Sequence, residues 1–224
     1  EENLDCSYAE VGCFHAAHNS AQYDKLARVL DYQVPGLEHD AYMIPRSEQH
    51  FELGTDTYFG GAIFPQHASV DPAAYHKGLM GKARDAGASI ISCCAAENIN
   101  RDKSGFSVKT SKGVVQVDKV IIATNGYTGS LTPRLQRRVI PIGSYVIATE
   151  PVAKELMDKL MPKDRIVSDT RKVVYYYRPS PDRSRIIFGG RVSLRESNPR
   201  FSAPKLHQSL TQIFPELEHP KISH

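Results

Sequence analysis

This sequence contains no tryptophan, no long apolar run and few cysteines, and these absences exclude several classes of protein. Without an apolar stretch of about 20 residues, we expect no membrane-spanning helix and no membrane partner. The cysteines form no C-x-x-C pair of the kind that binds zinc, so we expect no metal site and reduced thiols, as in a cytoplasmic protein. The four are Cys6, Cys13, Cys93 and Cys94.

An excess of charge of one sign is also lacking. The 28 Lys and Arg residues are intermixed with 25 Asp and Glu residues, which leaves a net charge of +3. A nucleic-acid-binding face needs clustered positive charge, and the one basic cluster, at Arg134, Arg137 and Arg138, is too short to form one. No Ser-His-Asp or paired-carboxylate motif is present either, so the catalytic residues are unknown. That absence is no obstacle to an enzyme whose cofactor carries the chemistry.

The most informative segment is the run from Val117 to Gly129, in which an apolar stretch ends in small and polar residues. Val120, Ile121 and Ile122 do not alternate with polar residues, which predicts a strand covered on both faces. The following turn, Ala123-Thr124-Asn125-Gly126, lets another molecule approach its backbone. The combination indicates a nucleotide cofactor at the carboxyl end of a strand, although a buried strand that ends at an ordinary surface turn has the same pattern.

The elements before this run form a regular succession. Asp71 and Pro72 predict the start of a helix that ends near Gly87. A strand containing Cys93 and Cys94 is expected next, with the two thiols on opposite faces. Residues 105–117 alternate around a turn and predict an antiparallel ribbon.

The remaining sequence predicts an antiparallel sheet with flanking helices, and therefore an α+β fold class. Strands are expected at residues 11–18, 58–64, 139–149, 173–177 and 185–189, the last two as a hairpin. Helices are expected from a cap at Ser20 to Pro35, from Pro151 to Leu160, and from Pro204 to Phe214.

Several stretches, in the right order, resemble one known family. They are IFPQHASVDPAAYHKGLMGKARDAGASI, VIIATNGYTGSLTP, VIPIGSYVIATEP and RIIFGGR, and they lie between residues 58 and 191. The chain resembles the FAD-dependent oxidoreductases of the D-amino-acid oxidase (DAO) family, most closely the gamma-glutamylputrescine oxidase-like enzymes. The family's G-x-G-x-x-G turn, whose helix holds the FAD pyrophosphate, is absent, as are its Trp-containing carboxyl-terminal strand and an initiator Met. We therefore expect an internal fragment of a longer enzyme.

The resemblance implies a domain organisation and a reaction. Residues 1–70 and 130–224 would form a substrate domain, and residues 71–129 an insert of the FAD-binding domain that docks beside a missing Rossmann domain. The apolar strand of the insert, left uncovered, could serve as a contact in a homo-oligomer. FAD is the implied cofactor of the parent enzyme, absent from the fragment, and the substrate is a small amine or amino acid. The parent would move a hydride from the carbon next to the amine to the flavin, with oxygen as acceptor.

The resemblance also implies roles for two groups of residues. Ala123, Thr124, Asn125 and Gly126 would approach FAD through their backbone, and Ala96 would contact its adenine end.

For substrate binding, the resemblance points to Tyr177 and Arg178. Strand alternation places Tyr175 with Tyr177 on one face and Tyr176 with Arg178 on the other, so only one of these pairs can face a site. The tyrosines could instead simply pack a sheet.

Two other functions fit the same sequence. The chain could be a stand-alone ligand-binding or interaction module without redox activity, which predicts a complete and self-satisfied fold. It could also belong to a flavin dehydrogenase that passes electrons to a quinone or a carrier protein instead of oxygen.

Overall fold

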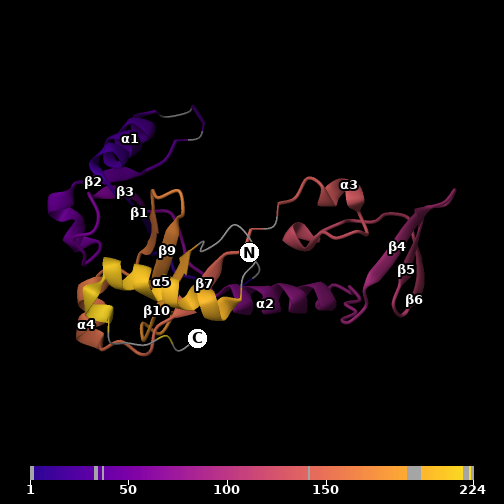
Figure 1. The fold of residues 1–224 in the computed structure, drawn as a ribbon. Helices are drawn as coiled ribbons and strands as arrows, with labels where there is room; N and C mark the ends of the chain where they lie inside the picture. The colour runs from indigo at the N-terminus through magenta and orange to yellow at the C-terminus, as the bar shows by residue number, and fades with distance from the viewer. Residues whose placement is uncertain are drawn as a thin grey trace. The chain divides into compact units, whose positions relative to one another are not determined.

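The computed structural model describes residues 3–32, 35–36, 38–140, 142–190, 198–218 and 222. The chain divides into two compact units (Figure 1). Unit 1 joins Glu1–Leu79 to Gly143–His224, and unit 2 is Met80–Ile142. Helices flank a mainly antiparallel sheet, so the predicted α+β fold class is confirmed. The assignment of residues 1–70, 71–129 and 130–224 to substrate and FAD-binding domains stays a prediction.

The described residues contain five α-helices, three short 3-10 helices and ten strands. The helices are α1 Ser20–Asp31, η1 Arg46–Phe51, α2 Pro72–Asp85, η2 Asn125–Tyr127, α3 Pro133–Gln136, α4 Lys154–Leu160, α5 Pro199–Ile213 and η3 Pro215–Leu217. The strands are β1 Cys13–Ala16, β2 Tyr42–Ile44, β3 Gly61–Phe64, β4 Ala96–Arg101, β5 Phe106–Thr110, β6 Gly113–Val117, β7 Tyr145–Ala148, β8 Ile166–Asp169, β9 Tyr175–Pro179 and β10 Ile186–Gly190. No described helix is both long enough and apolar enough to cross a membrane.

Unit 1 is built on a seven-stranded sheet in the order β2-β3-β1-β8-β9-β10-β7. Neighbouring strands are antiparallel except β1 and β8, which run parallel from Cys13 beside Ile166 to Ala16 beside Asp169. Strands β9 and β10 form the predicted hairpin. The strand predicted at residues 58–64 begins only at Gly61, because the backbone of Gly60 has a positive φ that suits a turn.

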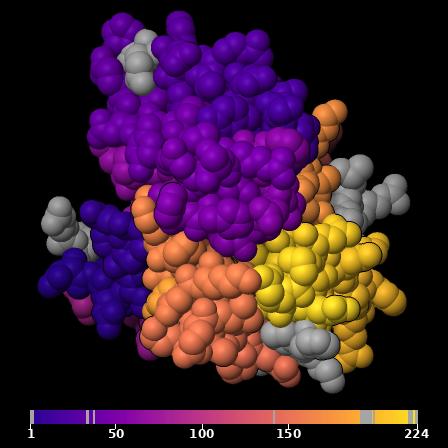
Figure 2. Space-filling model, turned by 90° about the vertical axis from the view of Figure 1, so that its left-hand side faces the viewer, coloured from indigo at the N-terminus to yellow at the C-terminus, as the bar shows by residue number. Residues whose placement is uncertain are grey.

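One face of this sheet forms the core of unit 1. Six register neighbours on that face are buried: Ile63, Phe14, Val167, Tyr177, Phe188 and Ile147. Helix α5 packs along β7 and β10 and adds Leu206 and Leu210 to the same core. In Figure 2, α5 (yellow), α4 (orange) and the purple segment around residues 46–57 meet on the surface of the molecule. Each large apolar side chain buried here stabilises the fold by roughly 1.5–3 kcal/mol.

Three predicted boundaries differ from the structure for local reasons. Asn19, rather than Ser20, caps α1, because its side chain accepts a hydrogen bond from the Gln22 amide. Helix α5 begins at Pro199, so Pro204 lies inside it and is not its first residue. The strand predicted at 139–149 is limited to β7, and Pro141 lies outside the described residues, as does Arg191 at the end of the RIIFGGR stretch.

Unit 2 contains the predicted ribbon, and its described residues form no buried core. Strands β4, β5 and β6 form a three-stranded antiparallel sheet. Cys93 and Cys94 precede this sheet, which corrects their predicted position within a strand. Among the described residues of unit 2, none is buried.

The covered strand predicted at Val120–Ile122 is wrong for this chain. None of the described strands includes these residues, and Ile121 is 89% exposed. A strand requires a hydrogen-bonding neighbour, and no described strand pairs with this segment. The apolar run is present in the sequence, but the partner that its pattern predicts does not come from the described residues.

Substitutions on the two opposite faces of the sheet, at β10 and β7, test which face belongs to the core. We expect Phe188→Ala to lower the free energy of unfolding by about 3–5 kcal/mol, because it opens a cavity between Tyr177 and Ile147. Val146→Ala, on the outward face of β7, should cost less than about 1 kcal/mol. Urea denaturation of both variants measures the difference, and equal losses would contradict the assignment of the core face.

Candidate functional site

The face of the seven-stranded sheet opposite the core carries a row of seven register neighbours, three of them polar, which we call the outer row. Its register neighbours, in order, are Met43, Ala62, His15, Ser168, Tyr176, Gly189 and Val146. Tyr176 is 37% exposed and Val146 is 54% exposed, so this end of the row is open to solvent. The polar members lie side by side on β1, β8 and β9, three adjacent strands.

His15 is fixed in this row by its neighbour on the parallel strand. Its Nδ1 atom lies 2.8 Å from the hydroxyl of Ser168, and the Cys13 thiol lies 3.9 Å from the same hydroxyl. Burial lowers the pKa of His15 below its usual value, and the charge of Asp169 only partly offsets this effect. Burial likewise raises the pKa of the Cys13 thiol. At neutral pH the imidazole of His15 in the row and the buried Cys13 thiol beside it are therefore both uncharged.

Tyr176 is held over a glycine on the next strand. Its hydroxyl lies 2.7 Å from the hydroxyl of Ser144. A Cβ atom at Gly189 would collide with the Tyr176 ring, so the absence of a side chain there lets the ring lie across the strand. The sequence contains the signal for this arrangement, because glycine in a strand often marks a close approach.

Tyr177 and Arg178, the predicted substrate residues, lie on opposite faces and are not brought together. Tyr177 is 2% exposed, and its ring packs 5.5 Å from the Phe188 ring, in the core. Arg178 shares the outer face with Tyr176, donates a hydrogen bond to the Val70 carbonyl at 2.8 Å, and lines a cavity of about 290 Å³. The outer pair, Tyr176 with Arg178, is thus the one that faces away from the core.

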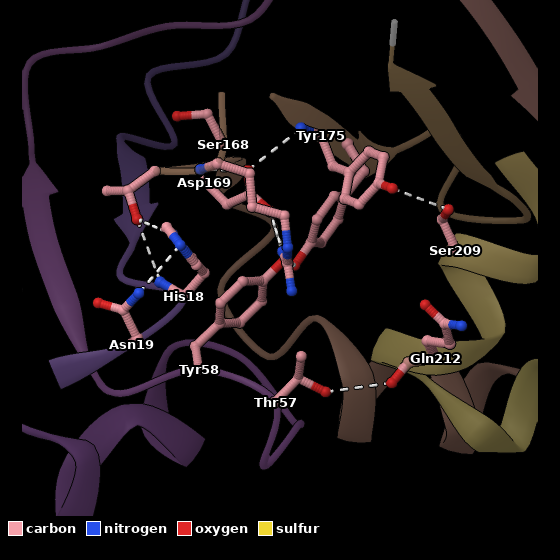
Figure 3. A network of polar contacts seen from close by, with 12 residues as sticks. His18, Asn19, Thr57, Tyr58, Ser168, Asp169, Tyr175, Ser209 and Gln212 are labelled. Atoms are coloured by element: carbon pink, nitrogen blue, oxygen red, sulfur yellow. Dashed lines mark hydrogen bonds and ion pairs between the residues drawn. The ribbon is translucent and has the colours of Figure 1, made fainter. Parts of the chain in front are cut away.

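The buried carboxylate of Asp169, at the end of β8, forms hydrogen bonds with residues of the core and of the neighbouring strand (Figure 3). Asp169, fully buried, pairs with Arg171 and accepts hydrogen bonds from the Tyr175 amide at 3.2 Å and the Tyr58 hydroxyl at 3.4 Å. Tyr177 in turn donates to the Tyr58 hydroxyl at 3.3 Å. Burial, and then the negative charge of Asp169, raise the pKa of Tyr58, so the phenol keeps its proton. This network joins the end of β8 to β9 and to the segment that carries Tyr58.

The predicted cofactor turn lies in unit 2 and is exposed. Asn125 has a φ of 46°, and the Thr128 hydroxyl donates to its carbonyl at 2.7 Å. A Cβ atom at Gly126 would meet nothing within 4 Å, and Tyr127 is 97% exposed. The turn is therefore structured, and its outer surface is free among the described residues.

Ala96 begins β4 and pairs with Thr110 in the same unit. No hydrogen bond or strand pairing joins it to residues 123–126 among the described residues, and its predicted contact with the cofactor stays a prediction. The described residues contain no glycine-rich turn at a helix start that could hold a pyrophosphate. They also contain no cluster of three metal-binding side chains.

Comparison with solved structures identifies the class of fold. Glycine oxidase from Bacillus cereus ATCC 14579 matches with a TM-score of 0.74 at 20% identity, over 100% of this chain and 61% of that one. L-proline dehydrogenase from P. horikoshii matches with a TM-score of 0.75 at 18% identity, over 98% of this chain and 60% of that one. The fold is that of the DAO-type flavoenzymes.

Comparison of sequences shows the family. The family of FAD dependent oxidoreductases known as DAO matches residues 1–224, and the chain belongs to it. Probable oxidoreductase OrdL from Rhizobium meliloti (strain 1021) is 31% identical over 189 residues, 84% of this chain and 43% of the relative. Gamma-glutamylputrescine oxidoreductase from Escherichia coli (strain K12) is 29% identical over 235 residues, 99% of this chain and 51% of the relative. The chain spans about half the length of these relatives, and the resemblance found in the sequence is confirmed.

The lowered pKa of His15 predicts how stability depends on pH. Because the unfolded state binds a proton near pH 6.5 and the folded state binds it only at lower pH, the fold loses stability as pH falls from 6.5 through the folded-state pKa. We expect His15→Asn to show a shallower loss between pH 7.5 and 5 in urea denaturation. Tyr176→Phe, which leaves His15 in place, should keep the full loss. Parallel curves for the wild type and His15→Asn would contradict the shift.

Proposed function

We propose that this chain is the substrate-binding part of an FAD-dependent enzyme that oxidises a C–N bond of a small amine or amino acid, with oxygen as the electron acceptor. The observation that carries the proposal is the outer row, where Ser144 and Gly189 orient Tyr176 at the solvent-exposed end of the row on a DAO-type sheet. The names of two similar proteins, gamma-glutamylputrescine oxidoreductase and glycine oxidase, support the donor class.

When bound, FAD supplies the acceptor for a hydride that leaves the carbon next to the amine nitrogen. The residues of this chain need only bind and orient the substrate and exclude water. In our proposal the Tyr176 hydroxyl, already aligned by Ser144, forms a hydrogen bond with the substrate. Arg178, on the same face, offers its remaining N–H groups to a substrate carboxylate. Tyr177 supports β9 from the core side.

In the same proposal, unit 2 contacts the cofactor through Ala96 and the turn at residues 123–126. The open surface at Gly126 and the ordered Asn125 backbone fit a close approach by the dinucleotide. The pyrophosphate cradle would come from a Rossmann domain outside these 224 residues, and its docking would cover apolar side chains such as Ile121. The absence of any buried residue among those described in unit 2 favours this arrangement over a stand-alone module. A cytoplasmic location and contacts between copies remain predictions.

A dehydrogenase is the second candidate. The fold match to L-proline dehydrogenase is as good as the match to glycine oxidase, so the fold is compatible with either electron acceptor. Oxygen readmission after anaerobic reduction separates the two functions.

The test uses the FAD-loaded protein with the sequence that its gene encodes on either side of this chain, and a panel of polyamine derivatives, glycine and sarcosine. We expect one member of the panel to bleach the yellow colour of the flavin when it is mixed with the protein anaerobically. Colour should return on admission of oxygen. Tyr176→Phe should lower kcat/KM by about tenfold or more through loss of a hydrogen bond in the complex. Tyr175→Phe is the matched control, because the Tyr175 hydroxyl accepts a hydrogen bond from Ser209 of α5, and it should change kcat/KM by less than about twofold. If Tyr175→Phe or Tyr177→Phe has the larger effect, the outer face is not the substrate face.

The cofactor contact has a test of its own. Gly126→Ala should leave stability unchanged, because the added methyl meets only open space in this chain, yet weaken FAD binding by about tenfold or more if the dinucleotide lies against it. Gly81→Ala is the control, since its methyl also meets nothing within 4 Å and Gly81 lies in α2, away from the turn in the sequence. Fluorescence titration of the apoprotein with FAD measures both variants, and equal affinities would remove residues 123–126 from the cofactor site.

A further inference from the structure

We propose that Ser144 takes the phenol proton of Tyr176, so that the Tyr176 oxygen meets the substrate only as a hydrogen-bond acceptor. The inference rests on the proposed function and deepens it, because an acceptor selects an N–H group of the amine over a carboxylate. Ser144 is then a positioning residue that decides which end of the substrate Tyr176 binds.

The direction of the hydrogen bonds follows from a backbone carbonyl beside Ser144. The Ser144 hydroxyl lies 3.4 Å from the Gly190 carbonyl oxygen and 2.7 Å from the Tyr176 hydroxyl. A carbonyl oxygen can only accept, so the hydrogen in the first contact belongs to Ser144, and a serine hydroxyl has one hydrogen to donate. The hydrogen in the second contact therefore comes from Tyr176. Because the opposite assignment would make one hydrogen bond instead of two, we assign donation from Tyr176 to Ser144 and from Ser144 to Gly190.

The position of the phenol oxygen is set by Gly189 on β10. A Cβ atom at Gly189 would collide with the phenol end of the Tyr176 ring, including its oxygen, so this end of the ring lies over the glycine. The Tyr176 hydroxyl thus reaches across β10 to Ser144, which immediately precedes β7. Tyr176 is 37% exposed, so among the described residues a ligand can still approach its ring.

A phenol that has donated its hydrogen offers a ligand only lone pairs. A neutral amine has N–H groups that can donate to these lone pairs. An ionised carboxylate has no hydrogen to donate, so its oxygens would face the Tyr176 oxygen without a bond between them. The contact between Ser144 and Tyr176 therefore discriminates between the two polar groups of an amino acid.

An accepting oxygen also suits the proposed reaction. As a hydride leaves the carbon for FAD, the lone pair of the amine nitrogen forms the second bond of the C=N product. A donor O–H would hold that lone pair in a hydrogen bond, whereas an acceptor binds the N–H and leaves the lone pair free. Ser144 therefore favours the reactive arrangement of the amine.

Arg178 has the opposite hydrogen-bonding property. It lies on the same outer face, two residues along β9 from Tyr176, and donates to the Val70 carbonyl at 2.8 Å. A guanidinium can only donate, so its other N–H groups suit a carboxylate. The outer face thus offers an acceptor for the amine at Tyr176 and donors for a carboxylate at Arg178.

Neutron diffraction from deuterium-exchanged crystals of the FAD-loaded protein tests the direction without turnover. We expect deuterium on the Tyr176 oxygen, pointing at Ser144, and deuterium on the Ser144 oxygen, pointing at the Gly190 carbonyl. Deuterium on Ser144 that points at Tyr176 would overturn the inference.

The kinetic test uses the FAD-loaded protein, the amine that bleaches its flavin, and acetate as a competing carboxylate. We expect Ser144→Ala to lower kcat/KM for the amine by about threefold or more, because the released phenol proton binds the nitrogen lone pair. The same proton can donate to a carboxylate, so acetate should inhibit Ser144→Ala more tightly by about threefold or more. Ser144→Thr, which keeps a hydroxyl, should return both values to within about twofold of the wild type.

Ser209→Ala is the matched control for these measurements. It also removes a serine hydroxyl bonded to a tyrosine of β9, but that tyrosine is Tyr175, which packs against the core. Neither kcat/KM nor acetate inhibition should change by more than about twofold.

Opposite changes for the amine and for acetate cannot come from a general loss of structure. If Ser144→Ala weakens both or changes neither, Ser144 does not determine what Tyr176 binds, and this inference alone fails. If no amine bleaches the flavin of the wild-type protein, the proposed function fails and the statement about the substrate fails with it. The deuterium positions still decide the direction of the hydrogen bonds in that case.

Discussion

The parallel pairing of β1 with β8 is the constraint on which the rest of unit 1 depends. These two strands are far apart in the sequence, and their register decides which side chains of the sheet face the core. Because side chains alternate along a strand, a slip of one residue would exchange the buried Phe14 and Val167 for His15 and Ser168. The register of β1 and β8 therefore places the buried apolar side chains on one face of the sheet and the outer row on the other.

The polar network at the ends of these strands reinforces that register. Asp169 is buried and would be costly there without partners, but it receives Arg171, a backbone amide and the Tyr58 hydroxyl. The partners are satisfied only when β8 is placed correctly beside β1 and the segment that carries Tyr58. On the other side of the sheet, the His15 and Ser168 hydrogen bond requires the same alignment. A buried polar group therefore specifies the arrangement in addition to any net stability that it contributes.

The sequence predicts local structure well where the determinant is local. Asp71 caps α2 through two amides, and the β9 and β10 hairpin follows from alternation and a turn. It also predicts that Tyr176 and Tyr177 face opposite ways, but alternation alone cannot tell which face is the core. That choice is made by α5, whose Leu206 and Leu210 cover one side, and by Gly189, which makes room for Tyr176 on the other. The pairing of His15 with Ser168 joins residues 153 positions apart, and no local pattern indicates it.

In unit 2, by contrast, a local sequence pattern predicts a strand that the structure does not contain. Val120, Ile121 and Ile122 have the composition of a covered strand, yet the described chain supplies neither a strand partner nor a covering layer for them. A run of apolar residues at the surface lacks the free energy that burial would contribute, and such runs often mark a contact surface. A domain that binds a dinucleotide is one surface that accounts for both this run and the structured, uncrowded turn at Asn125 and Gly126 that follows it. The two units therefore differ: the core of unit 1 is built from its own contacts, whereas the described residues of unit 2 include no buried residue.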